Sequence, residues 1–275
     1  MNHIFIDTHA HLDGEEFKDD LDLVISRAKH AGIGGIFLPS IDLNSIDGIK
    51  KICNEYPDYV FPMIGLHPEE VKADYESVLS KMHQCLQDNA IGRPVIAIGE
   101  VGLDFYWSRE YESEQLKAFE QQVEWSVETR LPLMIHCRKA QNELVHILKK
   151  YEKQLPGGVF HCFTGNEKEA AELLQFEGFV LGIGGVLTFK KSHLPEVLPS
   201  VVPLSRIVLE TDSPYMAPVP LRGKRNESSF VVHVLKKLAD CYGVSEETIA
   251  MMTTPLMTGP YCISVITFPF SPITI

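Results

Sequence analysis

The sequence lacks the long apolar runs of a membrane protein. No uninterrupted apolar stretch reaches the roughly 18 residues that a membrane-spanning helix needs. The opening segment 1–5 has neither the basic start nor the apolar core of a signal peptide. Hydrophobic residues make up 45% of the chain and the mean hydropathy is −0.01, as in ordinary globular proteins. We expect a folded cytoplasmic protein that does not contact a membrane.

Positive charge and closely spaced cysteines are also scarce. Lys and Arg total 25 against 37 Asp and Glu, a net charge of −12, which argues against a broad basic surface that coats duplex DNA. A nucleic acid held at one metal-filled site is still compatible with this charge. The six cysteines form no Cys-x-x-Cys pair, so we expect free thiols in a reducing cytoplasm.

Short apolar runs alternate with helix-like segments along the chain. The helix-like segments place apolar residues at helical spacing, as in Leu21, Val24, Ile25 and Ala28. Thr164 and Glu167 predict a capping box at the start of another helix. The apolar runs, which we predict to be strands, are residues 4–6, 35–38, 61–64, 95–98, 133–135, 158–160, 179–181 and 207–209. Runs that are apolar on both faces suit a parallel sheet covered by helices.

Eight such strand–helix units in 275 residues predict one α/β domain with the (β/α)8 TIM-barrel fold. An open, doubly wound sheet is the alternative. There is no linker, low-complexity tract or internal repeat. We assign residues 1–250 to the barrel. Residues 251–275 form an atypical tail without charged side chains, interrupted by prolines.

Polar residues follow the apolar runs at the positions where the predicted strands end. In a barrel all these ends open onto one face, so residues distant in sequence converge there. The candidate metal ligands among them are His9, His11, Glu100, His136, His161 and Asp212. Each residue alone could be a packed histidine, a helix cap or an ion-pair partner, but their shared position favours a metal site.

Imidazole and carboxylate ligands together suit Zn²⁺, Mn²⁺ or Fe²⁺. One catalytic ion with tetrahedral geometry needs three protein ligands and a water, so six candidates suffice for two divalent ions. Two ions can supply a hydroxide nucleophile at neutral pH and stabilise the attacking and leaving oxygens together. We expect Glu100 and Asp212 to be catalytic, with Asp212 acting as general base.

The same segments resemble the TatD family of metal-dependent hydrolases, within the amidohydrolase-like barrels. The resemblance spans residues 4–250, and its motifs occupy residues 7–12, 65–68, 99–104, 132–138, 161–165, 209–214 and 222–227. It implies a nuclease that hydrolyses phosphodiester bonds of DNA, often from the 3′ end of a single strand. It also implies that His9 and His11 bind one ion, His136 and His161 the second, Glu100 bridges both, and Asp212 completes the set. Family members are often active with Mg²⁺.

Further residues are candidates for substrate contact. His67 could contact a phosphate or protonate the leaving oxygen, and Arg222, Lys224 and Arg225 could bind phosphates near the eighth strand. Weaker candidates are Arg138, Arg109, an aromatic pair (Tyr106 and Trp107) that could stack on a base or anchor a loop, and three glycines (Gly182, Gly184 and Gly185) that could let the backbone approach a ligand. Glu210 is either a support for the ligands or part of a buried hydrogen-bond network.

Two other functions compete with the nuclease. One is hydrolysis of an amide, lactone or other phosphoester on the same barrel. Such relatives often bridge their metals with a carbamylated lysine at the fourth strand, where this chain has Glu100. The other is a non-catalytic metal-binding scaffold, which the full set of ligands disfavours. We expect a monomer without an obligate protein partner. The family usually ends in a charged helix, and we interpret the uncharged tail as an altered terminus.

Overall fold

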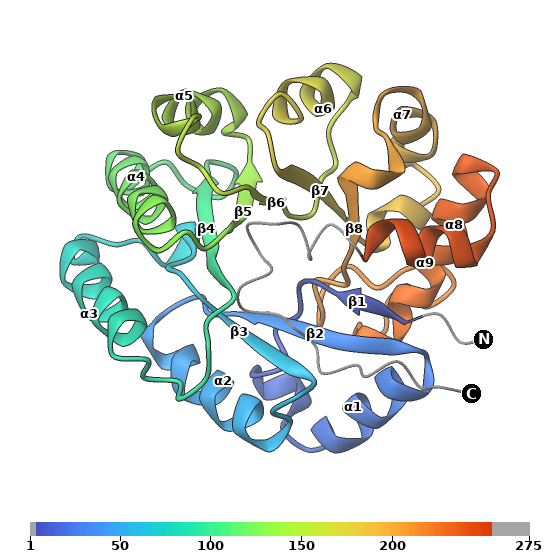
Figure 1. The fold of residues 1–275 in the computed structure, drawn as a ribbon, viewed down its shortest axis with the longest axis horizontal. Coiled ribbons are helices and arrows are strands. Elements are labelled where there is room, and N and C mark those ends of the chain that lie inside the picture. Colours follow the sequence, from blue (N-terminus) through green and yellow to red (C-terminus); the bar gives the residue numbers. More distant parts are fainter. Residues whose placement is uncertain (1–3, 255–275) are drawn as a thin grey trace.

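Eight parallel strands form a ring in the computed structural model, which describes residues 4–254 (Figure 1). The strands, each paired with its sequence neighbours, are β1 (Phe5–Asp7), β2 (Ile33–Pro39), β3 (Val60–Ile64), β4 (Ala97–Asp104), β5 (Leu133–Arg138), β6 (Gly158–Phe160), β7 (Phe179–Ile183) and β8 (Ile207–Leu209). The ring closes where the backbone N–H of Thr8 donates to the carbonyl of Leu209 over 3.0 Å. The TIM-barrel prediction is confirmed, and the open-sheet alternative is wrong.

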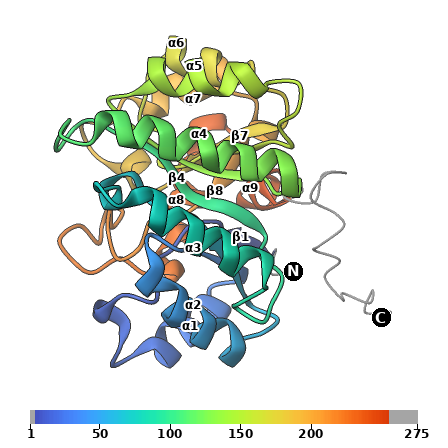
Figure 2. The ribbon, with the colours of Figure 1, turned by 90° about the vertical axis from the view of Figure 1, so that its left-hand side faces the viewer.

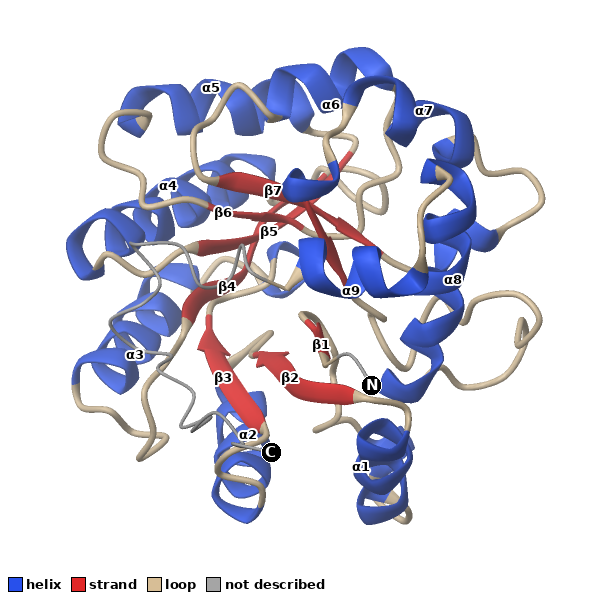
Figure 3. Ribbon diagram, turned by 45° about the vertical axis from the view of Figure 1, so that its right-hand side comes forward, coloured by secondary structure: helices blue, strands red, loops and turns tan. Residues whose placement is uncertain are grey.

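Helices surround this ring on the outside (Figure 3). They are α1 (Leu21–His30), α2 (Leu43–Glu55), α3 (Tyr75–Gln87), α4 (Glu112–Thr129), α5 (Gln141–Tyr151), α6 (Glu167–Leu173), α7 (Leu194–Val201), α8 (Val231–Tyr242) and α9 (Glu246–Thr253). The short 3-10 helices are Glu15–Phe17, Pro68–Glu70, Gly185–Thr188, Leu204–Arg206 and Ser228–Phe230. Figure 2 shows the long helices lying along the outside of the barrel. The stripe predicted in α1 is confirmed, since Val24, Ile25 and Ala28 are buried.

The capping box at α6 lies two residues later than predicted. The side chain of Asn166 accepts the N–H of Glu169 over 3.1 Å, and the Glu169 carboxylate accepts the N–H of Asn166 over 2.8 Å. The pair has the same i, i+3 spacing as Thr164 and Glu167, because that spacing is what the first helical turn requires. Thr164 is therefore left in the loop after β6.

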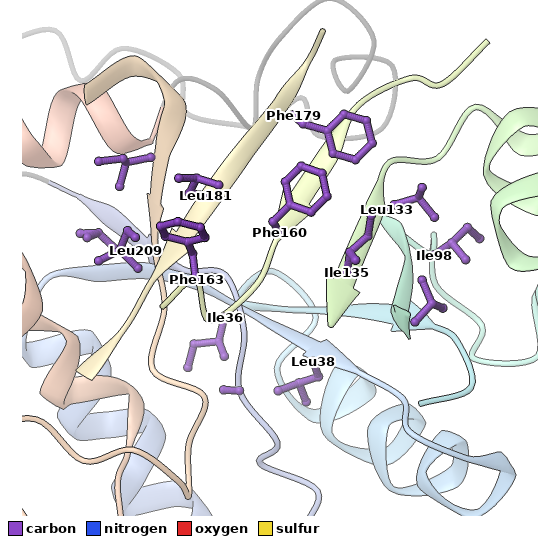
Figure 4. Close-up of a cluster of buried hydrophobic side chains, with 14 of the residues drawn as sticks. Ile36, Leu38, Ile98, Leu133, Ile135, Phe160, Phe163, Phe179, Leu181 and Leu209 are labelled. Atoms are coloured by element: carbon purple, nitrogen blue, oxygen red, sulfur yellow. The ribbon is translucent and has the colours of Figure 1, made fainter. Parts of the chain in front are cut away.

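Two apolar layers hold the barrel together. Consecutive residues of a strand point to opposite faces, so Ile36 and Leu38 pack outward against helices while Phe37 between them points inward. The inward layer is Ile6, Phe37, Met63, Ile96, Ala97, Met134, Val159, Val180 and Val208. Figure 4 shows part of the outward layer. Burying each large side chain contributes roughly 2 kcal/mol, which explains why the strands read as continuous apolar runs.

Helix α9 includes residues 251–253, the start of the segment predicted as a tail. The rest of that prediction concerns residues 255–275, which lie outside the described part of the chain. Among the helices of residues 4–254, none is long and apolar enough to cross a membrane.

Candidate metal centre

The predicted ligands come from five strands or from the residues that directly follow them. His9 and His11 follow β1, His161 follows β6, and Asp212 follows β8. Backbone pairing between the first and last strands continues past their ends, since the N–H of Asp212 donates to the carbonyl of His9 over 2.9 Å. Closure of the barrel therefore places His9 and Asp212, which are 203 positions apart in the sequence, side by side.

Glu100 and His136 lie inside longer strands than predicted. The apolar runs stop at Ile98 and Ile135, but β4 and β5 continue to Asp104 and Arg138. Gly102 of β4 pairs with His136 of β5, and a Cβ at Gly102 would lie 1.9 Å from the His136 carbonyl oxygen. The close backbone approach at this glycine keeps the two polar segments in the sheet.

The Glu100 carboxylate lies at the middle of the cluster, and its oxygen Oε2 faces one pair of histidines. Oε2 lies 3.1 Å from Nε2 of His9 and 3.4 Å from Nε2 of His11. Asp212 approaches the same side, with Oδ1 3.8 Å from Nε2 of His11 and 4.0 Å from Nε2 of His9. One set of imidazole and carboxylate donors thus surrounds Oε2.

The other oxygen of Glu100, Oε1, faces a different group of histidines. Oε1 lies 3.0 Å from Nδ1 of His136, 3.4 Å from Nε2 of His67 and 3.5 Å from Nε2 of His161. Nε2 of His161 is also 3.9 Å from Oδ1 of Asp212. A single carboxylate therefore stands between two sets of donor atoms.

These residues fit divalent metal ions. His9 and Glu100 are buried, and the Nε2 atoms of His9 and His11 are only 3.1 Å apart. Two imidazole lone pairs that approach so closely require a proton or a metal ion between them. The mixed nitrogen and oxygen donors suit Zn²⁺, Mn²⁺ or Fe²⁺.

The electrostatics of the cluster also favour bound positive charge. Burial lowers the pKa of His9 well below its usual value, and neighbouring His161 lowers it further. Burial alone would raise the pKa of the Glu100 carboxyl group, but the surrounding histidines, led by His67, hold that pKa well below its ordinary value. Burial likewise opposes charge on His161, yet Glu210 and Glu100 raise its pKa to about 10. The carboxylates stabilise cations here, whether protons or metal ions.

Asp104 orients His136, a role that the sequence did not reveal. Its Oδ2 lies 2.9 Å from Nε2 of His136, and its Oδ1 accepts the N–H of Tyr106 over 2.8 Å. Asp104 stands an even number of residues after Glu100 in one strand, and this spacing was the available signal.

Glu210 is buried and lies next to His161, so the structure combines both interpretations, contact with a ligand and a buried hydrogen bond. Its Oε1 lies 3.2 Å from Nδ1 of His161 and accepts the N–H of Cys162 over 2.6 Å. Two of the three glycines named as candidates for close backbone approach to a ligand lie against protein atoms. A Cβ at Gly182 would lie 2.1 Å from Oε2 of Glu210, and a Cβ at Gly185 would lie 1.9 Å from the Met216 carbonyl oxygen. These glycines make room for protein atoms.

Asp7 is a second buried carboxyl group that sequence reasoning missed. It accepts the N–H of Thr211 over 2.9 Å and the hydroxyl of the same residue over 2.7 Å. Burial raises the pKa of Asp7 to about 7, although these hydrogen bonds oppose the shift. Asp7 joins the end of β1 to the segment that carries Asp212. Its position two residues before His9 was the only signal in the sequence.

The predicted substrate contacts separate into three environments. His67 lies among the metal donors, with its ring 4.7 Å from that of His136. Arg222 and Lys224 are exposed, and the Arg222 guanidinium lies 3.8 Å from the centre of the Phe189 ring. Both nitrogens of the Arg225 fork instead donate to Asp20 over 2.7 Å. Arg225 therefore joins the loop after β8 to the start of α1, and its guanidinium group is not available to bind a phosphate.

Comparison with known proteins gives a consistent family match. The sequence model described as TatD related DNase matches residues 6–258. The uncharacterized metal-dependent hydrolase YabD of Bacillus subtilis is 36% identical over 251 residues, 91% of this chain and 96% of that protein. The 3′-5′ ssDNA/RNA exonuclease TatD of Pectobacterium carotovorum is 32% identical over 243 residues, 86% of this chain and 91% of that protein. The crystal structure of the Escherichia coli TatD homologue YJJV superposes with a TM-score of 0.85 at 27% identity, covering 94% of this chain and 98% of that one.

Proposed function

The chain belongs to the family of TatD-related DNases and is a metal-dependent nuclease, and we propose that it removes nucleotides from the 3′ end of single-stranded DNA. The observation that supports this proposal is the Glu100 carboxylate between two sets of donor atoms. The exonuclease relatives named for single-stranded DNA and RNA support the choice of substrate.

The proposed metal complement is two divalent ions, Zn²⁺, Mn²⁺ or Mg²⁺. His9, His11 and Asp212 would hold one ion, His136 and His161 would hold the other, and Glu100 would contact both. Bound there, the ions would activate water at neutral pH and neutralise charge on the phosphoryl oxygens.

The side chains around this centre have separate tasks in the proposal. Asp212 accepts the proton of the attacking water on a carboxylate oxygen, since it reaches both histidine sets within 4.0 Å. Asp104 and Glu210 fix the ring orientations of His136 and His161. These two supports keep the donor atoms in place before substrate arrives.

The phosphate contacts follow from position and charge. His67 lies at the edge of the cluster, 3.4 Å from Glu100, where its imidazole can donate a proton to the leaving oxygen or a hydrogen bond to the phosphate. Arg222 and Lys224 stand exposed in the loop after β8 and can hold the next phosphate. Arg225 does not take this role because its guanidinium group is hydrogen-bonded to Asp20.

The deciding experiment is product mapping on a 5′-labelled single-stranded oligonucleotide. We expect a ladder that shortens one nucleotide at a time from the 3′ end and stops when a chelator is added. The same oligonucleotide as RNA and as duplex DNA tests the preference for DNA and for single strands. Activity that survives chelation, or internal cleavage without a ladder, would contradict the proposal.

The cellular setting is a further part of the proposal. We propose a cytoplasmic monomer, because all the candidate ligands come from one chain and the five cysteines of residues 4–254 are free, as suits a reducing compartment. Light scattering of the purified protein tests the first point, and cell fractionation tests the second.

A further inference from the structure

The rim around the metal centre is divided by charge. The loops after β1, β2 and β3 (residues 8–20, 40–42 and 65–74) contain nine acidic residues and two lysines. Five of the acidic residues lie in the first loop, one in the second and three in the third. Glu15, Glu16 and Asp19 among them are exposed. This side of the rim repels a nucleic-acid backbone.

The rest of the rim has the reverse charge balance. The loops after β4, β5, β7 and β8 (residues 105–111, 139–140, 184–193 and 210–230), together with Arg138 at the end of β5, contain eight basic residues, of which Arg225 is paired with Asp20. Their acidic residues are Glu110, Glu210, Asp212 and Glu227, of which Glu210 and Glu227 are buried and Asp212 belongs to the metal centre. In a chain of net charge −12, this concentration of positive charge marks one route to the site.

Two exposed aromatic side chains lie on the basic side. Tyr106 is 50% exposed and Trp107 is 67% exposed, so neither belongs to the core. The Arg138 guanidinium lies 3.8 Å from the centre of the Tyr106 ring and 5.2 Å from that of Trp107. Large apolar groups held in solvent beside a cation are typical of a binding surface.

This cluster of Tyr106, Trp107 and Arg138 borders the metal centre directly. The Tyr106 backbone donates to Asp104, and Asp104 contacts His136. Arg138 follows His136 by two residues in β5. Neighbouring strands β4 and β5 (Figure 1) therefore carry both metal ligands and the exposed cluster.

We propose that single-stranded nucleic acid reaches the metal centre over the β4–β5 side of the rim, with a base stacked on Trp107 and Tyr106 and a phosphate on Arg138. The acidic loops after β1 to β3 keep the strand from crossing the other side. This inference rests on the proposed nuclease function and names the binding surface that the function requires. Any unpaired base can stack on an aromatic ring, so this surface should select single strands without preference for a base sequence.

Tryptophan fluorescence tests the contact in the intact, metal-loaded protein. The chain has two tryptophans, and Trp125 is only 3% exposed, so quenching by an added ligand reports on Trp107. We expect a phosphorothioate oligothymidylate, which resists hydrolysis, to quench the wild-type emission. In Trp107→Phe the quenching should disappear while binding persists, because phenylalanine still stacks. Unquenched wild-type emission at saturating oligonucleotide would overturn the proposal.

Affinity measurements separate stacking from a general surface effect. Trp107→Ala should bind the oligonucleotide ~5- to 150-fold more weakly, and this defect should shrink on an oligonucleotide with abasic sites. Leu23→Ala removes a side chain of similar exposure, 60%, from α1 and should bind as wild type. Trp107→Ala affinity equal to wild type, or an equal defect on the abasic strand, would contradict base stacking.

The phosphate contact has its own readout. Arg138→Gln should weaken binding and reduce the slope of log affinity against log salt by about one. Lys149→Gln, an exposed change on α5, is the control. An unchanged salt slope in Arg138→Gln would exclude this contact. A wild-type protein whose emission is quenched by the phosphorothioate strand, but which hydrolyses neither the unmodified oligothymidylate nor bis(4-nitrophenyl) phosphate, would overturn the proposed function and retain the binding surface.

Discussion

Glu210 stands directly behind His161, with its Oε1 3.2 Å from Nδ1 of the imidazole. The same oxygen accepts the backbone N–H of Cys162, so the carboxylate is anchored to the turn that carries His161. The other ring nitrogen of His161 faces Glu100. Carboxylates therefore lie at both ring nitrogens of His161, Glu210 at Nδ1 and Glu100 at Nε2.

Replacing Glu210 tests this support. Glu210→Gln should weaken metal binding ~10- to 100-fold, because His161 loses the charge that orients its ring. Competition with a metal-sensitive dye measures the affinity. Glu177→Gln, an exposed carboxylate before β7, should have wild-type affinity. If Glu210→Gln also binds metal as wild type does, Glu210 has only a packing role.

Gly182 should be sensitive for the same reason. A methyl group there would lie 2.1 Å from Oε2 of Glu210, so Gly182→Ala must displace that carboxylate. We expect a loss of metal affinity similar to that of Glu210→Gln, and little additional loss in the double variant because both changes break one contact. Fully additive losses would show that Gly182 acts elsewhere.

Glu100→Gln should affect both metal positions. The amide keeps the shape but removes the charge that faces the two histidine sets. Nuclease activity should fall by at least ~100-fold, more than for loss of a supporting group. Elemental analysis should find less than the wild-type metal content, and circular dichroism should show an intact fold. Full metal content with full activity would refute the assignment of Glu100 to both sets.

Metal removal should destabilise the protein. Under the proposed function, bound cations compensate the crowded imidazole and carboxylate groups, and they should bind the folded state and not the unfolded chain. An ion at about 100 times its dissociation constant adds ~2.7 kcal/mol of stability, so EDTA should lower the Tm by roughly 5 °C or more. Calorimetry with excess Mn²⁺ restored is the check. An unchanged Tm would mean that the cluster holds no ion.

Asp20 should stabilise the fold in a pH-dependent way. Hydrogen bonds from Arg225, reinforced by Arg27, lower the pKa of Asp20 below its ordinary value of 3.8. The stabilisation is therefore complete above that value and is lost as the pH falls through the lower folded-state pKa. The partly exposed network is worth about 1 kcal/mol. Urea unfolding of Asp20→Asn should show that deficit at pH 7 and a smaller one near pH 3; a deficit independent of pH would exclude the ion pairs as its cause.

Sequence periodicity was sufficient to predict the barrel. Each of the eight apolar runs overlaps one of the eight strands, because residues buried on both faces of a parallel sheet must be apolar. The expectation that functional residues follow strand ends was correct for His9, His11, His161 and Asp212, since all parallel strands of a barrel end on one face. Glu100 and His136 instead lie inside β4 and β5. Local signals were less reliable, as the shifted capping box at Asn166 shows.

The partners of each side chain were decided only by the tertiary structure. Asp104 beside His136, Glu210 behind His161 and Arg225 on Asp20 are contacts across different elements. They depend on strand register, on closure of β8 against β1 and on side-chain rotamers, none of which is encoded in sequence spacing. The sequence by itself therefore determined the chemistry available at the mouth of the barrel. Folding decided which oxygen faces which nitrogen, because those distances join residues that are tens to hundreds of positions apart.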